Sequence, residues 1–196
     1  MVGRAILLGV SLLIPTAFAS AGKQVAVPGS DVTFDAAIKK KIAGETVTLV
    51  LTGTALREKF WLNVYAIGSY VEKGTRVNGP EALAAADVPK KLHLVLERDV
   101  EGDSMADALK ESVLANHPKQ FTKELKTMCN YVRANPVNQG DHVWFTHLPG
   151  EGLICKISHE PEVTIKSVAF ARAVWEIYFG KKNIGVAIKK GLSSRL

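Results

Sequence analysis

The sequence has little cysteine, and its cysteines and histidines are not spaced as metal ligands. Its two cysteines are Cys129 and Cys155, and none of the five histidines stands at a zinc-ligand spacing from them. The sequence also lacks a serine-centred nucleophile elbow, a phosphate-binding loop and a dinucleotide fingerprint. Because no motif for a metal, nucleotide or serine-hydrolase site is present, we expect neither a cofactor nor a metal.

Long hydrophobic runs are missing after the first 21 residues, and no later run could cross a bilayer. The charge balance is mildly basic, with a formal net charge of +6. The lysines lie in short scattered clusters, whereas nucleic-acid-binding proteins concentrate them on one face among aromatic residues. We therefore predict no nucleic-acid partner and no membrane span in the mature protein. Weak attraction to an anionic membrane surface remains compatible with this charge.

The N-terminal segment indicates export. Arg4 is the only charge before Lys23, and a short apolar stretch between them ends in small residues. This pattern predicts a secretory signal peptide over residues 1–21, cleaved after Ala19 or Ala21. A membrane anchor is the alternative interpretation, but the apolar run is short for a span. We expect a periplasmic or secreted mature protein.

The remaining chain, residues 22–196, is predicted to form one α+β domain, a size that allows a sizeable core. After a polar leader, strands come first, then a helix pair, then strands, then two terminal helices, an order that favours layered packing. The predicted strands are 46–51, 60–71, 91–96, 142–148, 153–158 and 162–165, and the predicted helices are 103–116, 119–133, 168–179 and 184–190. The sequence does not indicate the oligomeric state.

The two cysteines allow two interpretations. Cys129 falls on a predicted helix and Cys155 on a predicted strand. In an oxidising compartment they can form one disulfide that joins helix to sheet. Because cysteine is also among the most buried residue types, two buried free thiols are equally compatible with the sequence.

Arg57 precedes the long extended segment at 60–71. If the strand geometry continues back to this residue, its guanidinium shares a face with Asn63 and Tyr65. Both faces of the segment carry apolar and aromatic residues, so one face either lines a partly polar cavity or packs as part of a fully covered strand. A buried arginine requires an anionic or carbonyl partner, whereas one at the start of a strand is commonly solvated.

Two segments resemble the chalcone isomerase-like family, and in particular its exported bacterial members. They are GTALREKFWLNVYAIGSYVE at 53–72 and FARAVWEIYFGKKNIG at 170–185. The resemblance extends over roughly 47–191. It implies an open-faced β-sandwich, in which helices are layered against a large antiparallel sheet and a ligand cleft lies between them. The family includes plant chalcone isomerases, which close a flavanone ring, and plastid fatty-acid-binding proteins.

The resemblance also assigns positions. The cleft arginine of the family matches Arg57. Tyr65 stands where the plant enzymes hold a threonine, and it resembles the fatty-acid-binding branch, in which arginine and tyrosine hold a carboxylate. Leu109 matches a tyrosine of the enzymes and Ile177 matches a hydroxyl residue, whereas Asn116 matches their asparagine. The loss of hydroxyl donors makes the cleft more apolar and less suited to stabilising developing charge.

We therefore predict a protein that binds a small lipophilic or aromatic carboxylate, without chalcone isomerase activity. The predicted ligand-binding residues are Arg57, Asn63, Tyr65, Leu109, Val113, Asn116, Ile177 and Tyr178. One alternative is an intramolecular lyase that acts on a chalcone-like enone through Arg57, Tyr65 and Asn116. A second alternative is an envelope interaction module with a vestigial cleft. Fold alone does not decide between these functions.

Overall fold

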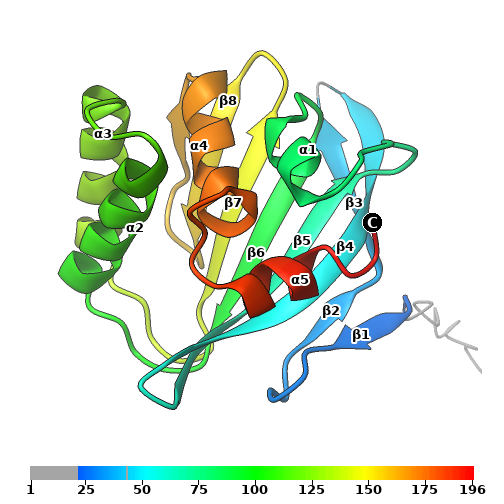
Figure 1. Ribbon diagram of the computed structural model, residues 1–196, viewed down its shortest axis with the longest axis horizontal. Coiled ribbons are helices and arrows are strands. Elements are labelled where there is room, and N and C mark those ends of the chain that lie inside the picture. The colour runs from blue at the N-terminus through cyan, green and yellow to red at the C-terminus, as the bar shows by residue number, and fades with distance from the viewer. Residues whose placement is uncertain (1–21, 43) are drawn as a thin grey trace, which may run out of the picture.

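The computed structural model describes residues 22–42 and 44–196, and the predicted signal peptide at 1–21 lies outside them. Within these residues, one antiparallel sheet holds seven strands, each beside its neighbours in the sequence (Figure 1). They are β3 (Ala37–Ile42), β4 (Glu45–Lys59), β5 (Leu62–Glu72), β6 (Lys90–Leu96), β7 (His142–Leu148), β8 (Gly152–Ile157) and β9 (Val163–Ile165). The predicted α+β class, with helices layered on a large antiparallel sheet, is confirmed.

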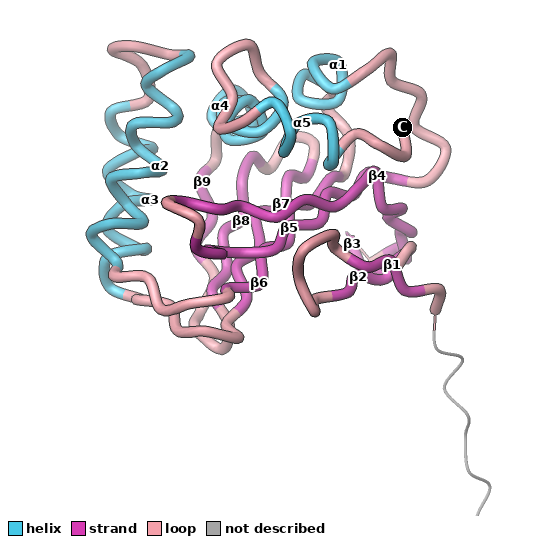
Figure 2. The backbone as a smooth tube through the Cα atoms, turned by 60° about the horizontal axis from the view of Figure 1, so that its bottom comes forward, coloured by secondary structure: helices cyan, strands magenta, loops and turns pink. Residues whose placement is uncertain are grey.

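The two faces of the sheet have different covers (Figure 2). The small hairpin of β1 (Gln24–Ala26) and β2 (Thr33–Asp35) packs on one face, over β4 and β5, through Val27 and Phe34. The other face carries the helices and the larger core. The helices are α1 (Pro80–Ala85), α2 (Gly102–Asn116), α3 (Thr122–Ala134), α4 (Val168–Phe179) and α5 (Val186–Leu192). Strand β5 is therefore covered on both faces for most of its length.

Alternation along the strands sets which side chains face the helices. In β6, Leu92, Leu94 and Leu96 are buried in the larger core, because residues two apart share a face. His93 points to the opposite face and meets the edge of the Phe34 ring. In β7, the same rule separates His142 from His147, because five residues is an odd separation. His147 lies in the buried interior, whereas His142 lies on the other face, beside His93.

The β4–β5 hairpin departs from the prediction at two places. The expected interruption at Thr52–Thr54 does not end the strand, because a register shift between Leu51 and Gly53 absorbs one residue as a bulge. The Thr52 hydroxyl donates to the Leu192 carbonyl oxygen at 2.9 Å, which ties the bulge to α5. The predicted strand 60–71 begins later, at Leu62, because Phe60 and Trp61 form the turn.

Helix α4 lies at the centre of the helical layer, and its bounds match the prediction. Ser167 caps its N-terminus by accepting a hydrogen bond from the Phe170 backbone N–H at 3.1 Å. Its final turn buries Ile177 and Tyr178, which face the sheet side of the molecule.

Cys129 of α3 and Cys155 of β8 are both buried free thiols. The structure therefore shows the alternative of two free thiols and not a disulfide. The Cys129 thiol donates weakly to the Ala106 carbonyl oxygen at 3.6 Å. In residues 22–42 and 44–196, no helix combines the length and apolar character that crossing a bilayer requires.

Candidate functional site

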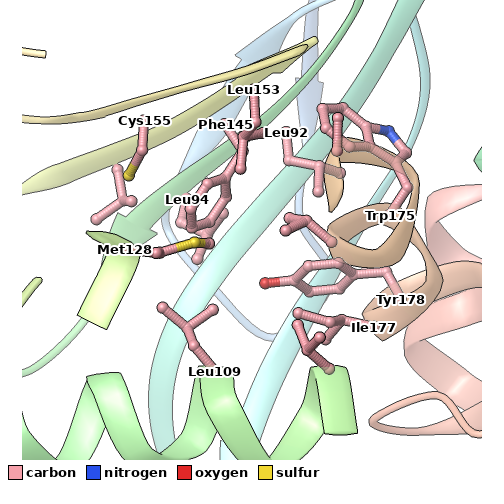
Figure 3. Packing of buried hydrophobic residues seen from close by; sticks show 14 of the residues in the cluster. Leu92, Leu94, Leu109, Met128, Phe145, Leu153, Cys155, Trp175, Ile177 and Tyr178 are labelled. Carbon is pink, nitrogen blue, oxygen red and sulfur yellow. The ribbon is translucent and has the colours of Figure 1, made fainter. Parts of the chain in front are cut away.

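A cavity of about 200 Å³ lies between the sheet and helices α2 and α4. Most of its wall is apolar. Figure 3 shows the Tyr178 ring between Leu94 and Leu109, with its hydroxyl directed away from α4. The apolar lining residues are Val64, Leu94, Leu96, Val100, Met105, Ala108, Leu109, Phe145, Ile177 and Ile184, and the polar ones are Arg57, Lys59, Tyr65, Ser104, Ser112 and Tyr178.

Arg57 stands at the polar end of the cavity. It is half-buried near the end of β4, directly opposite Tyr65 in the β4–β5 register. Its Nη1 donates to the Ile184 carbonyl oxygen at 3.2 Å, in the loop between α4 and α5. The guanidinium thus has a carbonyl partner and faces the cavity, so the fully solvated alternative is wrong. This single hydrogen bond uses one of the five N–H donors of the guanidinium, which leaves the others available for a ligand.

Two phenols accompany this guanidinium. The Tyr65 and Tyr178 hydroxyl oxygens lie 3.4 Å apart. Burial raises the pKa of both tyrosines, and the charge of Arg57 offsets only part of this effect. Both phenols therefore stay protonated at physiological pH, so each can donate a hydrogen bond to an anion in the cavity.

The electrostatic character of the cavity favours an anion. Arg57 and Lys59 are its two cationic lining residues, and the part of the lining that the structure describes includes no aspartate or glutamate. Among residues 22–42 and 44–196, no group of three histidine, cysteine, aspartate or glutamate side chains is arranged to hold a metal ion. A half-buried guanidinium with two phenols beside it suits a planar anion such as a carboxylate.

Five predicted ligand-binding residues come together in this cavity: Arg57, Tyr65, Leu109, Ile177 and Tyr178. They come from β4, β5, α2 and α4, elements that are far apart in the sequence. The positions where the resemblance places hydroxyl donors of the enzymes thus hold the apolar side chains of Leu109 and Ile177 in the cavity wall.

Asn63 does not share a face with Tyr65, contrary to the prediction, and it does not line the cavity. A register shift in the β4–β5 pair makes Val64 an extra residue between the partners of Arg57 and Glu58. One extra residue reverses the alternation, so Asn63 points to the opposite face from Tyr65. Its side-chain amide donates to Glu97 at 2.8 Å and to a backbone oxygen in the β1–β2 loop at 3.3 Å. Val64 lines the cavity instead.

Two further predicted residues, Val113 and Asn116, also do not line this cavity. Val113 is fully buried in the larger core and does not line the cavity. Asn116 is a structural clamp. Its side chain donates to the Lys182 carbonyl oxygen at 2.9 Å and accepts from the Lys182 backbone N–H at 3.2 Å, which fastens α2 to the α4–α5 loop.

Sequence reasoning missed most of the α2 wall. Ser104, Met105, Ala108 and Ser112 line the cavity together with Leu109. Their spacings of three and four residues place them on one helix face, so the helical period could have identified them once Leu109 was chosen. Leu94, Leu96 and Phe145 also line the cavity. Sequence reasoning could not identify them, because it does not show which face of the sheet the helices cover.

Comparisons with known proteins agree with this architecture. The sequence profile of the chalcone isomerase-like family matches residues 30–193. The structure is similar to the crystal structure of a fatty-acid binding protein of Arabidopsis thaliana, with a TM-score of 0.68 and 16% sequence identity, over 88% of this chain and 94% of that chain. At this identity the likeness shows the fold alone. No curated protein sequence matches this chain significantly.

Proposed function

This chain belongs to the chalcone isomerase-like family, and from that premise we propose that it binds a small lipophilic or aromatic acid in the cavity beside Arg57. One observation carries the proposal. A mostly apolar cavity holds a guanidinium close to two protonated phenols, and the described lining supplies no carboxylate to neutralise the guanidinium. Such a site is complementary to an amphipathic acid, with its anionic group at Arg57 and its apolar body among the leucines.

The binding mode follows from the donors. The carboxylate takes the N–H groups of Arg57 that the Ile184 carbonyl leaves unused, and the Tyr65 and Tyr178 hydroxyls donate to its oxygens. The apolar body packs against Leu94, Leu109 and their neighbours. The volume of about 200 Å³ is below the range of roughly 300–1,000 Å³ typical of pockets for drug-sized ligands, which favours a small ligand or one that extends outside.

The relative of the same fold supports the ligand class, because its name describes a fatty-acid binding protein. The lyase alternative has less support. Ring closure requires ordered donors where charge develops on the ketone, and Leu109 and Ile177 supply none in this cavity. We therefore assign binding and not catalysis to the site.

We expect dodecanoate to bind the wild-type protein more tightly than dodecanol, and Arg57→Met to weaken dodecanoate binding about 10- to 150-fold. A hydrogen bond to a charged group contributes roughly 1.5–3 kcal/mol, which corresponds to that range. Arg57→Met retains an apolar side chain of similar length, so it removes mainly the charge. Isothermal titration of delipidated protein measures both effects.

Arg76→Met is the matched control, because Arg76 is an exposed arginine that does not line the cavity. It should bind dodecanoate as the wild type does. Equal affinity for the acid and the alcohol, or equal losses in the two arginine variants, would contradict the proposal. Native mass spectrometry of protein purified without delipidation should also detect a bound acid in the wild type.

We also propose that the protein is exported, on the strength of the signal-peptide pattern in residues 1–21. Expression of the full chain in a bacterium should yield mature protein in the periplasmic or extracellular fraction, with its N-terminus at Ser20 or Gly22. Intact-mass measurement of each fraction checks this outcome. Full-length protein confined to the cytosol contradicts it.

A further inference from the structure

The turn between β4 and β5 exposes three large apolar side chains. Phe60, Trp61 and Leu62, here called the hairpin tip, are 76%, 94% and 54% exposed. The hairpin extends to the lower left of Figure 1, away from the helical layer. These side chains make few contacts with the rest of the protein. One contact is with Lys59, whose ammonium lies 5.6 Å from the centre of the Phe60 ring. A contiguous exposed apolar group of this kind indicates an interaction site.

The backbone at the hairpin tip is unfavourable for these residues. Phe60 and Trp61 have φ angles of 51° and 62°, and they form the two-residue loop of the hairpin. Positive φ at both central positions is typical of a type I′ turn, which favours Asn-Gly and disfavours bulky residues. Aromatic side chains here add strain to the fold and bury little area in it. A contact outside the protein would offset this cost.

The hairpin tip adjoins the ligand cavity. A second hollow of about 380 Å³ is lined by Phe60 and Leu62 of the tip. This hollow shares Lys59, Val64 and two further residues, Val100 and Ser104, with the cavity wall. The two hollows thus border on the same four residues, so the second hollow adjoins the wall of the cavity that holds Arg57.

We propose that the hairpin tip inserts into the interfacial region of a lipid bilayer, and that the acid passes between bilayer and cavity along the second hollow. The inference rests on the proposed function for its cargo. A bilayer fits because tryptophan and phenylalanine favour the membrane–water interface, and because an amphipathic acid resides there. Direct passage would spare the apolar body of the acid from exposure to water.

The charges beside the hairpin tip specify the kind of bilayer. The second hollow carries two cations, Lys59 and Arg98, and two carboxylates, Asp99 and Glu101. The two positive and two negative charges around this hollow cancel, so they offer no net attraction to anionic lipid, although the whole chain is basic. Insertion therefore depends on apolar burial, and a zwitterionic surface suffices.

The test uses co-sedimentation with phosphatidylcholine vesicles. We expect the double variant Phe60→Asn/Trp61→Gly to partition into the vesicle pellet at least about tenfold less than the wild type, because burying even one such side chain supplies a factor of this order. Asn-Gly is the preferred type I′ sequence, so the double variant should fold at least as well as the wild type. Val186→Ser is the matched control, since Val186 is 80% exposed on α5, and its partitioning should be unchanged.

A blue shift of wild-type tryptophan emission on adding vesicles would confirm insertion, and its loss in the double variant, which lacks Trp61, would assign the shift to the hairpin tip instead of Trp144 or Trp175. The proposal is overturned if the wild type stays in the supernatant, if the double variant sediments equally, or if sedimentation requires anionic lipid and is lost at high salt. Sedimentation without vesicles would assign the hairpin tip to self-association instead.

Dodecanoate titration without vesicles separates this proposal from the proposed function. The double variant should bind soluble dodecanoate as the wild type does, because Arg57 and both phenols are intact. Failure of the wild type to bind dodecanoate overturns the proposed function and the cargo route, whereas vesicle sedimentation still decides whether the hairpin tip inserts.

Discussion

Replacing Gly53 with alanine is expected to lower the free energy of unfolding by about 3 kcal/mol or more. A Cβ atom at this position would lie 2.1 Å from the Gly191 carbonyl oxygen and 2.7 Å from the Leu192 carbonyl carbon. Both are backbone atoms of α5, so no flexible side chain can move aside. The φ angle of 153° at Gly53 adds strain for any residue with a Cβ.

This close backbone contact is what docks α5 on β4. A Cβ at Gly191 would in turn lie 2.6 Å from the Thr54 carbonyl oxygen, so the contact needs glycine on both sides. Because α5 follows the loop whose Ile184 carbonyl oxygen binds Arg57, displacing α5 should also disturb the cavity. We therefore expect weaker dodecanoate binding in whatever fraction of the Gly53→Ala variant folds.

Urea unfolding measures this effect, with Gly74→Ala as the control. Gly74 also has a positive φ, 90°, but a Cβ there would meet nothing within 4 Å. Its alanine variant should lose only the backbone strain, about 1 kcal/mol. Similar losses in the two variants would show that strain, and not the β4–α5 contact, sets the cost at Gly53.

Replacing Lys90 with methionine is expected to cost about 3 kcal/mol or more of unfolding free energy. Lys90 is 1% exposed, and its ammonium donates to the carbonyl oxygens of Leu83, Ala84 and Ala86 at 3.1, 2.8 and 2.7 Å. These carbonyls lie in and just after the last turn of α1, where a helix leaves its carbonyl groups without internal partners. The ammonium also lies 5.1 Å from the centre of the Trp175 ring.

Burial lowers the pKa of Lys90, which means that the fold disfavours its charge, while the three carbonyl oxygens oppose this by binding the protonated form. Methionine fills similar space without donating, so it leaves the carbonyl oxygens unpaired. The outcome depends on which effect is larger. We expect the unpaired carbonyls to dominate, because α1 has six residues and little else to hold its end.

Thermal and urea unfolding check this expectation, with Lys39→Met as the matched control. Lys39 is exposed on the edge strand β3, and its loss should change stability by less than about 0.5 kcal/mol. Hydrogen exchange should show faster opening of α1 in the Lys90 variant. A Lys90→Met protein as stable as the wild type would mean that relief from burying the charge offsets the lost bonds.

Local patterns predicted much of the fold because they depend only on neighbouring residues. The predicted bounds of α4 match the structure, in which Gly180 follows the helix and Ser167 caps its start, both local signals. The three N-terminal strands were missed because they are short or lysine-rich. In β3, alternate positions such as Lys39 and Lys41 are exposed, and charged residues of this kind are typical at the edge strand of a sheet. In the sequence, the same lysines make the segment look like a polar loop and not a strand.

By itself, the sequence determined the layered α+β class, the family and most of the longer elements, and it predicted that Arg57 and Tyr65 share a face. Each of these depends on side-chain period or on residues close in the chain. Only the tertiary structure decided that the bulge at Val64 turns Asn63 away, that Asn116 clamps a loop, and that the hairpin tip lies beside the cavity. The physical reason is that register shifts and interelement contacts join segments whose sequences carry no local signal of one another.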